Sequence, residues 1–435
     1  MKLYKTRLLL FLTLVLPFVG IAQQQFTLRN AIDTALKNNF DIQIAENFVE
    51  IATKSNSYGF AGGLPTVSAN AGDNASLTTI DQKLSDGTEN NISDKGENAI
   101  NAGVSASMVL FNGFKISATK ERLNRLQDLS EIQLNQQIQN TIADIMVTYY
   151  DIIRQEKYLK IIQNSLDVSK QKLDILNVKN NVGMANAVDM LQAQTDVNSA
   201  EQLLTLQKLV IEQTKSDLLL LINARKSLDF QVEDTLIIDK SMQLESVVNY
   251  LNRNPQLLSA EQQILIDEQI VKEVSSQRYP SVKLNAGYDF YHANLNKGSI
   301  ELNQNYGPSA GVTMQIPIFN GNIYKTQSDV AKIRVKNSIL EKESLLVSLT
   351  TQAEKVYRSY STTLQQVDSQ RKNYEMTQKL VDVVLQQFNV SQATIIDVKT
   401  AQSSLDNAAY LLVNLMYSAK VSEIELKKLT YSLSY

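Results

Sequence analysis

The stretch that decides the fold runs from Ile138 to Leu176 and reads IQNTIADIMVTYYDIIRQEKYLKIIQNSLDVSKQKLDIL. Its apolar residues recur every seven positions, at Ile138, Ile145, Ile152, Leu159, Leu166 and Leu173. Further apolar residues stand three or four positions from members of this series, at Ile142, Tyr149, Ile162 and Leu176. A 3.5-residue repeat is typical of a left-handed coiled coil. The stretch therefore predicts a long helix that packs along partner helices.

The last third of the chain repeats this pattern at an offset of 208 positions. The second series is Leu346, Ala353, Tyr360, Val367, Tyr374, Val381 and Phe388. The triplet Phe111-Asn112-Gly113 before the first series matches Phe319-Asn320-Gly321 before the second at the same offset. The chain is therefore predicted to be an internal tandem duplication.

The positions of Gly and Pro divide the chain into long helices and short windows. Most of them lie in two windows, 59–113 and 280–321, and after the first window only Gly183 and Pro255 interrupt the rest. The uninterrupted stretches predict long helices at about 114–180, 184–224, 322–388 and 394–431. At 1.5 Å per residue the first would span roughly 100 Å.

The two Gly/Pro-rich windows predict strand pairs. Apolar residues alternate with small or polar ones in the second window, at Val282, Leu284, Ala286, Tyr288 and Phe290. The predicted pairs cover 64–80 with 98–111 and 280–293 with 304–318, each preceded by a shorter helix. Alternation fits a membrane β-barrel wall or a soluble sheet on a core. The membrane alternative is favoured because the rods offer this sheet no other core.

Composition excludes several function classes. The 435 residues include no Cys and one His, which excludes thiol chemistry, zinc–thiolate sites and His-based triads. A net charge of −3 argues against a nucleic-acid partner. No Gly-rich phosphate-binding loop is present. The sequence therefore predicts a protein that is not an enzyme and has no cofactor or metal.

The first 22 residues have the pattern of an export signal. Lys2, Lys5 and Arg7 precede an apolar run, and Gly20-Ile21-Ala22 offers small residues for cleavage. The run is shorter than the ~20 residues of a membrane-spanning helix. We therefore divide the chain into a signal peptide (1–22), a first repeat (23–224), an equatorial connector (225–243) and a second repeat (244–435).

Several landmarks occur in the same order along the chain: the Pro-led strands at Pro65 and Pro280, the triplets at Phe111 and Phe319, the turns followed by Asp189 and Asp397, and Asn254-Pro255. Together they resemble the TolC family of outer-membrane channel proteins. The resemblance covers nearly the whole chain. It implies a mainly helical fold whose antiparallel coiled coils form an α-barrel tunnel, while four strands per protomer contribute to a twelve-stranded barrel of a homotrimer in outer-membrane lipid.

The resemblance also implies a function. It indicates a passive exit duct of a tripartite efflux or type I secretion system, located in the cell outer membrane and extending into the periplasm. Its partners would be a periplasmic adaptor (membrane fusion) protein and an inner-membrane RND or ABC transporter that supplies the energy.

Four residues are candidates for a constriction at the periplasmic end of the pore: Asp189, Phe388, Asp397 and Thr400. The resemblance implies a cation-attracting ring at Asp397 and three residues later, where this chain has Thr400 instead of an acid. The alternative for both Asp residues is the favourable placement of an acid near a helix N-terminus. For Phe388 the alternative is packing in the heptad series.

The two helix reversals are the predicted docking ends for the periplasmic partner. Their residues are Val182, Gly183 and Met184 in the first turn and Val390, Ser391 and Gln392 in the second. Two other classes remain open from the sequence, a periplasmic adaptor and a structural coiled-coil protein of the cell envelope. An adaptor would show one helical hairpin rather than a duplicate, and a tether would not need the alternating windows.

Overall fold

The computed structural model describes residues 26–224, 230–233 and 235–433. The predicted signal peptide at 1–22, and residues 225–229 and 234 of the predicted connector, lie outside the described residues.

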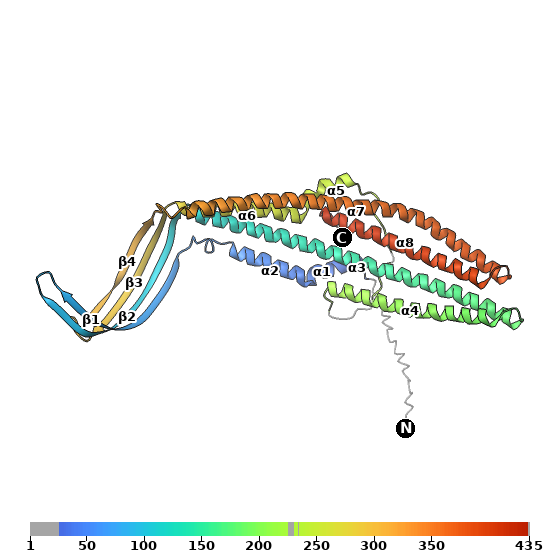
Figure 1. Cartoon of the computed structure of the whole chain (residues 1–435), viewed down its shortest axis with the longest axis horizontal. Helices are drawn as coiled ribbons and strands as arrows, with labels where there is room; N and C mark the ends of the chain where they lie inside the picture. Colours follow the sequence, from blue (N-terminus) through green and yellow to red (C-terminus); the bar gives the residue numbers. More distant parts are fainter. Residues whose placement is uncertain (1–25, 225–229, 234, 434–435) are drawn as a thin grey trace, which may run out of the picture.

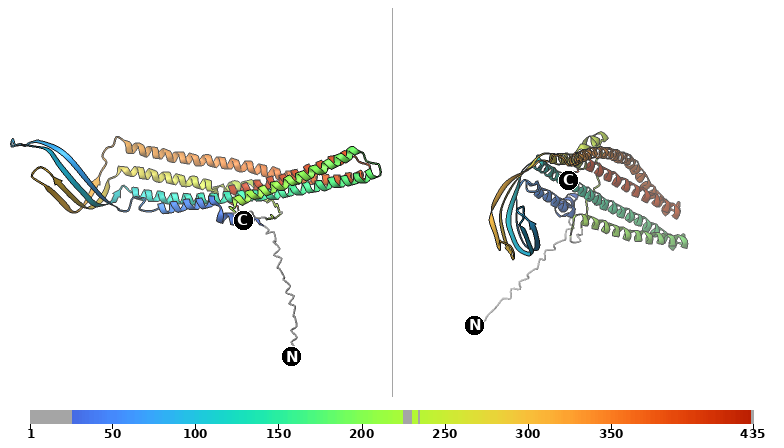
Figure 2. Two further views of the ribbon diagram at one scale, coloured as in Figure 1. Left: turned by 90° about the horizontal axis from the view of Figure 1, so that it is seen from below. Right: turned by 60° about the vertical axis from the view of Figure 1, so that its left-hand side comes forward.

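The molecule is a long rod with a sheet at one end and two helix reversals at the other (Figures 1 and 2). Two helical hairpins make the rod, α3 (Lys115–Asn181) with α4 (Ala187–Leu221), and α7 (Ile323–Asn389) with α8 (Ile395–Leu429). The shorter helices are α1 (Leu28–Asn38), α2 (Phe40–Ser55), α5 (Leu244–Tyr250) and α6 (Pro255–Ser275). This architecture confirms the predicted fold class of long antiparallel helices with a four-stranded sheet.

The heptad residues form the core of the rod. In α3, Ile145 and Ile152 are fully buried and Tyr149 is nearly so. They pack with α1 and with Leu218 and Ile222 at the end of the α4 hairpin arm. The main core therefore lies at the waist of the rod, where the shorter helices cover the long ones.

The described part of the connector is anchored at this waist. Phe230 is buried against Phe26, with their ring centroids 5.0 Å apart. Lys420 of α8 donates to the Ile237 carbonyl at 2.8 Å, and Glu423 accepts from the Asp239 backbone at 2.9 Å. Because Lys420 and Glu423 also pair with each other at 3.0 Å, these two buried charges compensate one another.

The four strands form one antiparallel sheet in the order β1-β2-β3-β4. Their bounds are β1 Thr66–Lys83, β2 Glu89–Asn112, β3 Ser281–Leu295 and β4 Leu302–Gln315. β2 begins nine residues before the 98 expected from sequence, because its ladder with β1 continues through polar residues that show no alternation. β4 ends at Gln315, before Pro317, which has no N–H for a ladder.

Among the described residues, none of the helices combines the length and the apolar content needed to cross a bilayer.

The two repeated triplets make sharp turns between strand and helix. Gly113 and Phe114 both have positive φ, at 67°, and so do Gly321 (65°) and Asn322 (63°). The surroundings of the two glycines differ. A Cβ on Gly113 would lie 2.6 Å from both the Ser276 carbonyl oxygen and the Tyr279 Cβ, whereas nothing lies within 4 Å of one on Gly321.

This difference predicts unequal costs for the same substitution. Gly321→Ala should lose about 1 kcal/mol from the positive φ alone. Gly113→Ala should lose about 1–3 kcal/mol more, because the methyl group collides with backbone. Heat-unfolding midpoints of the two detergent-solubilised variants give the comparison, and equal midpoints would contradict it.

Candidate functional site

Over the part of the sheet nearer the helices, one face is apolar across all four strands. The backbone pairing places Val104 opposite Ala69 on one side and opposite Tyr288 on the other. Paired residues share a face. The apolar face comprises Val67, Ala69, Ala102, Val104, Ala106, Met108, Leu284, Ala286, Tyr288, Phe290, Tyr306, Pro308, Ala310 and Val312. The sequence alternation in the windows thus becomes one continuous apolar surface.

The opposite face is made of small and polar residues. Ser68 and Ser105 hydroxyls lie 3.0 Å apart. Ser107 donates to the Asn285 side chain at 3.0 Å, and Asn285 in turn donates to Thr313 at 3.2 Å. These bonds run from strand to strand and join polar side chains of all four strands, and a face of this composition is suited to contact with water.

Both outer edges of the sheet are open in the protomer. Within the part of the chain that the structure describes, β1 pairs with β2 alone and β4 pairs with β3 alone. Each edge strand therefore presents a row of backbone groups without a strand partner.

At the other end of the rod, the two reversals expose apolar side chains. Val182 and Met184 in the first turn and Val390 in the second are all largely exposed. Positive φ values at Gly183 (76°) and Ser391 (63°) turn the chain, and Gln392 donates its backbone N–H to the Gln387 carbonyl at 2.8 Å. The two turns lie at the same end of the molecule (Figure 1).

Asp189 and Asp397 each occupy the third position of a helix and take part in its cap. The Asp189 carboxylate accepts from the Asn186 side chain at 2.8 Å, and Asn186 caps the Asp189 N–H. Asp397 forms a reciprocal capping box with Thr394. Hydrogen bonds from the Thr394 hydroxyl and backbone hold the Asp397 pKa below its ordinary value, so this exposed carboxylate is charged at neutral pH.

The other two predicted constriction residues differ in exposure. Phe388 is only 4% exposed and packs with Leu176 and Val398 between the hairpins. The Lys179 ammonium lies 4.5 Å from its ring centroid and donates to its carbonyl at 2.5 Å. Thr400 is exposed and donates to the Ile396 carbonyl of its own helix at 2.8 Å. In the protomer, Phe388 is thus a packing residue of the tip.

A charged cluster that the sequence reading missed joins the two hairpins near the tip. Lys172 of α3, whose side chain is 0% exposed, pairs with Asp196 of α4, which is 14% exposed. Lys399 of α8, 54% exposed, donates to the same carboxylate at 2.9 Å. Asp196 therefore neutralises a buried cation and also links the first hairpin to the second.

The Asp196 carboxylate is ionised at neutral pH. Burial raises its pKa, but hydrogen bonds from Lys172, Lys399 and Gln192 lower it more, and the net pKa lies below its ordinary value. A lowered folded-state pKa adds stability above the ordinary Asp value near 3.8, and this stability is lost as the pH falls through the folded-state pKa.

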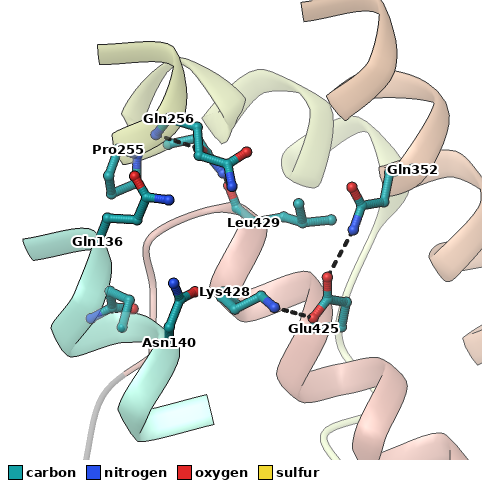
Figure 3. A pocket seen from close by; sticks show the side chains of 10 residues that line it. Gln136, Asn140, Pro255, Gln256, Gln352, Glu425, Lys428 and Leu429 are labelled. Atoms are coloured by element: carbon teal, nitrogen blue, oxygen red, sulfur yellow. Dashed lines mark hydrogen bonds and ion pairs between the residues drawn. The ribbon is translucent and has the colours of Figure 1, made fainter. Parts of the chain in front are cut away.

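A polar cavity of about 80 Å³ lies at the waist between α3, α6, α7 and α8 (Figure 3). Asn140, Gln256 and Gln352 are among its lining residues, and Glu425 accepts from Gln352 at 2.9 Å and from Lys428 at 2.7 Å. Its walls are mostly carboxamides. Across the described residues, no group of three or more His, Cys, Asp or Glu is arranged to hold a metal ion.

The comparison with protein families decides the identity. The sequence model of the outer membrane efflux protein family matches residues 31–224 and 247–430, one segment for each repeat. The chain belongs to this family. The resemblance to TolC-type channels and the predicted outer-membrane location are thereby confirmed.

Individual relatives are distant in sequence, but their alignments with this chain cover more than half of each protein. The chain is 21% identical over 410 residues to the probable efflux pump outer membrane protein TtgC of Pseudomonas putida, covering 92% of this chain and 82% of TtgC. Over 299 residues it is 21% identical to the probable outer membrane lipoprotein SilC of Salmonella typhimurium, covering 66% of this chain and 62% of SilC.

Solved structures share the fold. The structure of CusC aligns with a TM-score of 0.75 at 17% identity and covers 93% of this chain and 92% of CusC. The CmeC outer membrane channel of Campylobacter jejuni aligns with a TM-score of 0.74 at 18% identity, covering 93% and 85%. This efflux family protein is a channel protein rather than an enzyme, and the adaptor and structural coiled-coil alternatives gain no support.

The cluster at the tip makes a paired prediction. Asp196→Asn should destabilise the tip of the first hairpin by about 3–5 kcal/mol, because it leaves buried Lys172 without its counter-charge. Lys399→Gln should cost only about 0–1 kcal/mol, because that ammonium is largely in water. Amide hydrogen exchange in the last three turns of α3 measures both. Equal protection in the two variants would contradict the assigned roles.

Proposed function

We propose that three copies of this chain close one water-filled duct that crosses the outer membrane and continues as a helical tunnel into the periplasm. The observation that carries this proposal is the sheet: one apolar face, one polar face and two open edges. In lipid, unpaired strand edges cost several kcal/mol for each backbone group, so the edges require partners.

Sister chains meet that requirement. If β4 of each copy pairs with β1 of the next, a closed barrel of twelve strands results from three copies, whereas four strands are too few to close. The apolar face would then contact lipid and the polar face the water-filled lumen.

The helices support the same assembly. Exposed apolar residues follow one face of α2, at Phe40, Ile44, Phe48 and Ile51. A second exposed series follows α7 at heptad spacing, at Ile333, Leu340 and Val347. Coiled-coil faces of this kind are stable in water only when a partner helix covers them. We assign them to contacts between neighbouring copies.

The two helix reversals are the proposed docking site for the periplasmic partner. Their exposed Val182, Met184 and Val390 side chains suit docking of a periplasmic adaptor, through which an inner-membrane RND or ABC transporter would deliver its cargo. Relatives carry names such as antibiotic efflux and toluene efflux pump outer membrane protein, which favours small-molecule efflux over type I secretion for this chain as well.

The two faces of β4 allow a matched test of the barrel. Ala310→Arg places a cation on the apolar face and should reduce membrane assembly, at about 2–4 kcal/mol for a residue at mid-bilayer. Ser309→Arg, one residue earlier on the polar face, should assemble normally and alter conductance instead. Yields of heat-sensitive oligomer on gels and planar-bilayer currents distinguish the two. Equal assembly of both variants would refute the assignment of the faces.

For the tip we propose that Asp189, Asp397 and Thr400 line the periplasmic constriction, with Phe388 packed behind them. Asp397→Asn keeps an acceptor for the Thr394 cap but removes the charge, and should lower cation selectivity or raise conductance in planar bilayers. Asp329→Asn, at the opposite end of α7, is the control. Currents that Asp397→Asn leaves unchanged would reject the pore role and leave only the capping role.

A further inference from the structure

The region where strands meet helices carries an unusual number of exposed large apolar side chains. They come from four separate segments of the chain and are Tyr58, Phe60, Leu64, Phe114, Tyr279, Ile318 and Phe319. Phe114 is 72% exposed and Phe319 is 81% exposed. Rings this exposed to water are unfavourable for a folded protein unless another surface covers them.

The sheet register places three of these segments at one level. β1 begins at Thr66, β2 ends at Asn112, β3 begins at Ser281 and β4 ends at Gln315. Asn112 pairs with Ser281, and Ser281 pairs with Gln315. β1 begins farther from the helices, where Thr66 pairs with Ser107, but the segment before it lies beside the start of α3: a Cβ on Gly63 would lie 3.1 Å from the Ile116 side chain. The exposed side chains therefore form a band across the base of the sheet. We call this band, together with Lys115, Lys120, Arg278 and Lys325 in the same segments, the junction collar.

The junction collar continues the apolar face of the sheet. A register shift between Val109 and Phe111 pairs Phe111 with Val282, a residue in line with the apolar series of β3. The Phe111 ring contacts Phe114 edge-on, with ring centroids 5.4 Å apart. The apolar surface assigned to lipid therefore runs without a break into the collar on β2.

Charge in the collar has one sign. The segments 56–65, 111–120, 276–280 and 316–328 contain Lys115, Lys120, Arg278 and Lys325 and no Asp or Glu, although the chain as a whole carries −3. Lys115, Arg278 and Lys325 are exposed. None of these three forms an ion pair with another described residue. Lys120 lies 5.9 Å from the Tyr58 ring centroid.

Exposed aromatic rings and unpaired cations occur together where a protein contacts the membrane surface. Rings at the boundary between acyl chains and headgroups flank the apolar band of membrane sheets. Lys and Arg next to them attract anionic lipids. We infer that the junction collar binds the phosphate headgroups of anionic phospholipids and so fixes how deep the sheet sits in the bilayer. This inference rests on the proposed function and adds a lipid class and residues to it.

The chain offers a clean test because it contains no Trp, so one substitution introduces a unique fluorophore. Phe114→Trp and Phe319→Trp report on the collar, and Tyr306→Trp reports on the apolar face of β4. Met376→Trp, exposed on α7 far from the sheet, is the control. Each full-length variant is reconstituted in vesicles of equal parts phosphatidylcholine and phosphatidylglycerol, with bromine on the acyl chains of one of the two lipids.

We expect both collar reporters to be quenched, with brominated phosphatidylglycerol quenching about twofold or more better than brominated phosphatidylcholine. The additional quenching by brominated phosphatidylglycerol should fall in high salt, which screens the attraction between the cations and the headgroups. It should also vanish in a background of Lys115→Gln, Arg278→Gln and Lys325→Gln. It should persist with Lys355→Gln, Lys372→Gln and Lys379→Gln, which remove three exposed cations from α7.

The possible outcomes distinguish failure of the collar inference from failure of the proposed channel function. A quenched Tyr306→Trp with unquenched collar reporters would overturn the collar alone and place these rings between copies. Equal quenching by the two lipids would overturn the preference for anionic headgroups. An unquenched Tyr306→Trp would overturn the proposed function, and the collar with it.

Discussion

The structure depends on the backbone groups at the two open edges of its sheet. Four strands satisfy each other internally, but the outer N–H and C=O groups of β1 and β4 have no strand partner among the residues that the structure describes. Lipid offers no hydrogen bonds, so an open sheet with one apolar face is unstable both in water and in a bilayer. In the proposed assembly, closure by identical chains would remove both problems with one contact. The two halves of the chain supply two strands each, and the duplication therefore sets the number of strands that a copy contributes.

The long helices, like the sheet, have surfaces that are buried within the protomer and surfaces that are left exposed. Heptad residues such as Ile145 and Ile152 bury one side of each long helix within the protomer. The remaining apolar faces of α2 and α7 are exposed and, like the sheet edges, are not covered by any segment that the structure describes. At the far end, the Asp196 carboxylate pairs with Lys172 inside the first hairpin and with Lys399 of the second hairpin, so one carboxylate adds a specific electrostatic link to the apolar packing of the tip.

The sequence predicted the elements that have a periodic apolar pattern. It did not predict features that depend on contacts between distant segments of the chain. Seven-residue spacing identified the long helices, and alternation identified the apolar face that the register confirms. The first half of β2 was missed because residues such as Asn90 and Asn91 form a ladder without any apolar pattern. Lys172 and Asp196 were overlooked, although the equivalent positions of the second repeat hold Leu380 and Ser404, and this mismatch was the available signal. The capping role of Asp397 was visible from its spacing to Thr394.

The central claim is that identical chains close the sheet around water, and imaging of the full-length protein in a lipid disc tests it most directly. The account predicts three copies, with β4 of each paired to β1 of the next and a continuous solvent-filled axis from the sheet to the helix turns. A particle whose sheet lies outside the lipid, or whose axis is filled by packed side chains, would contradict it.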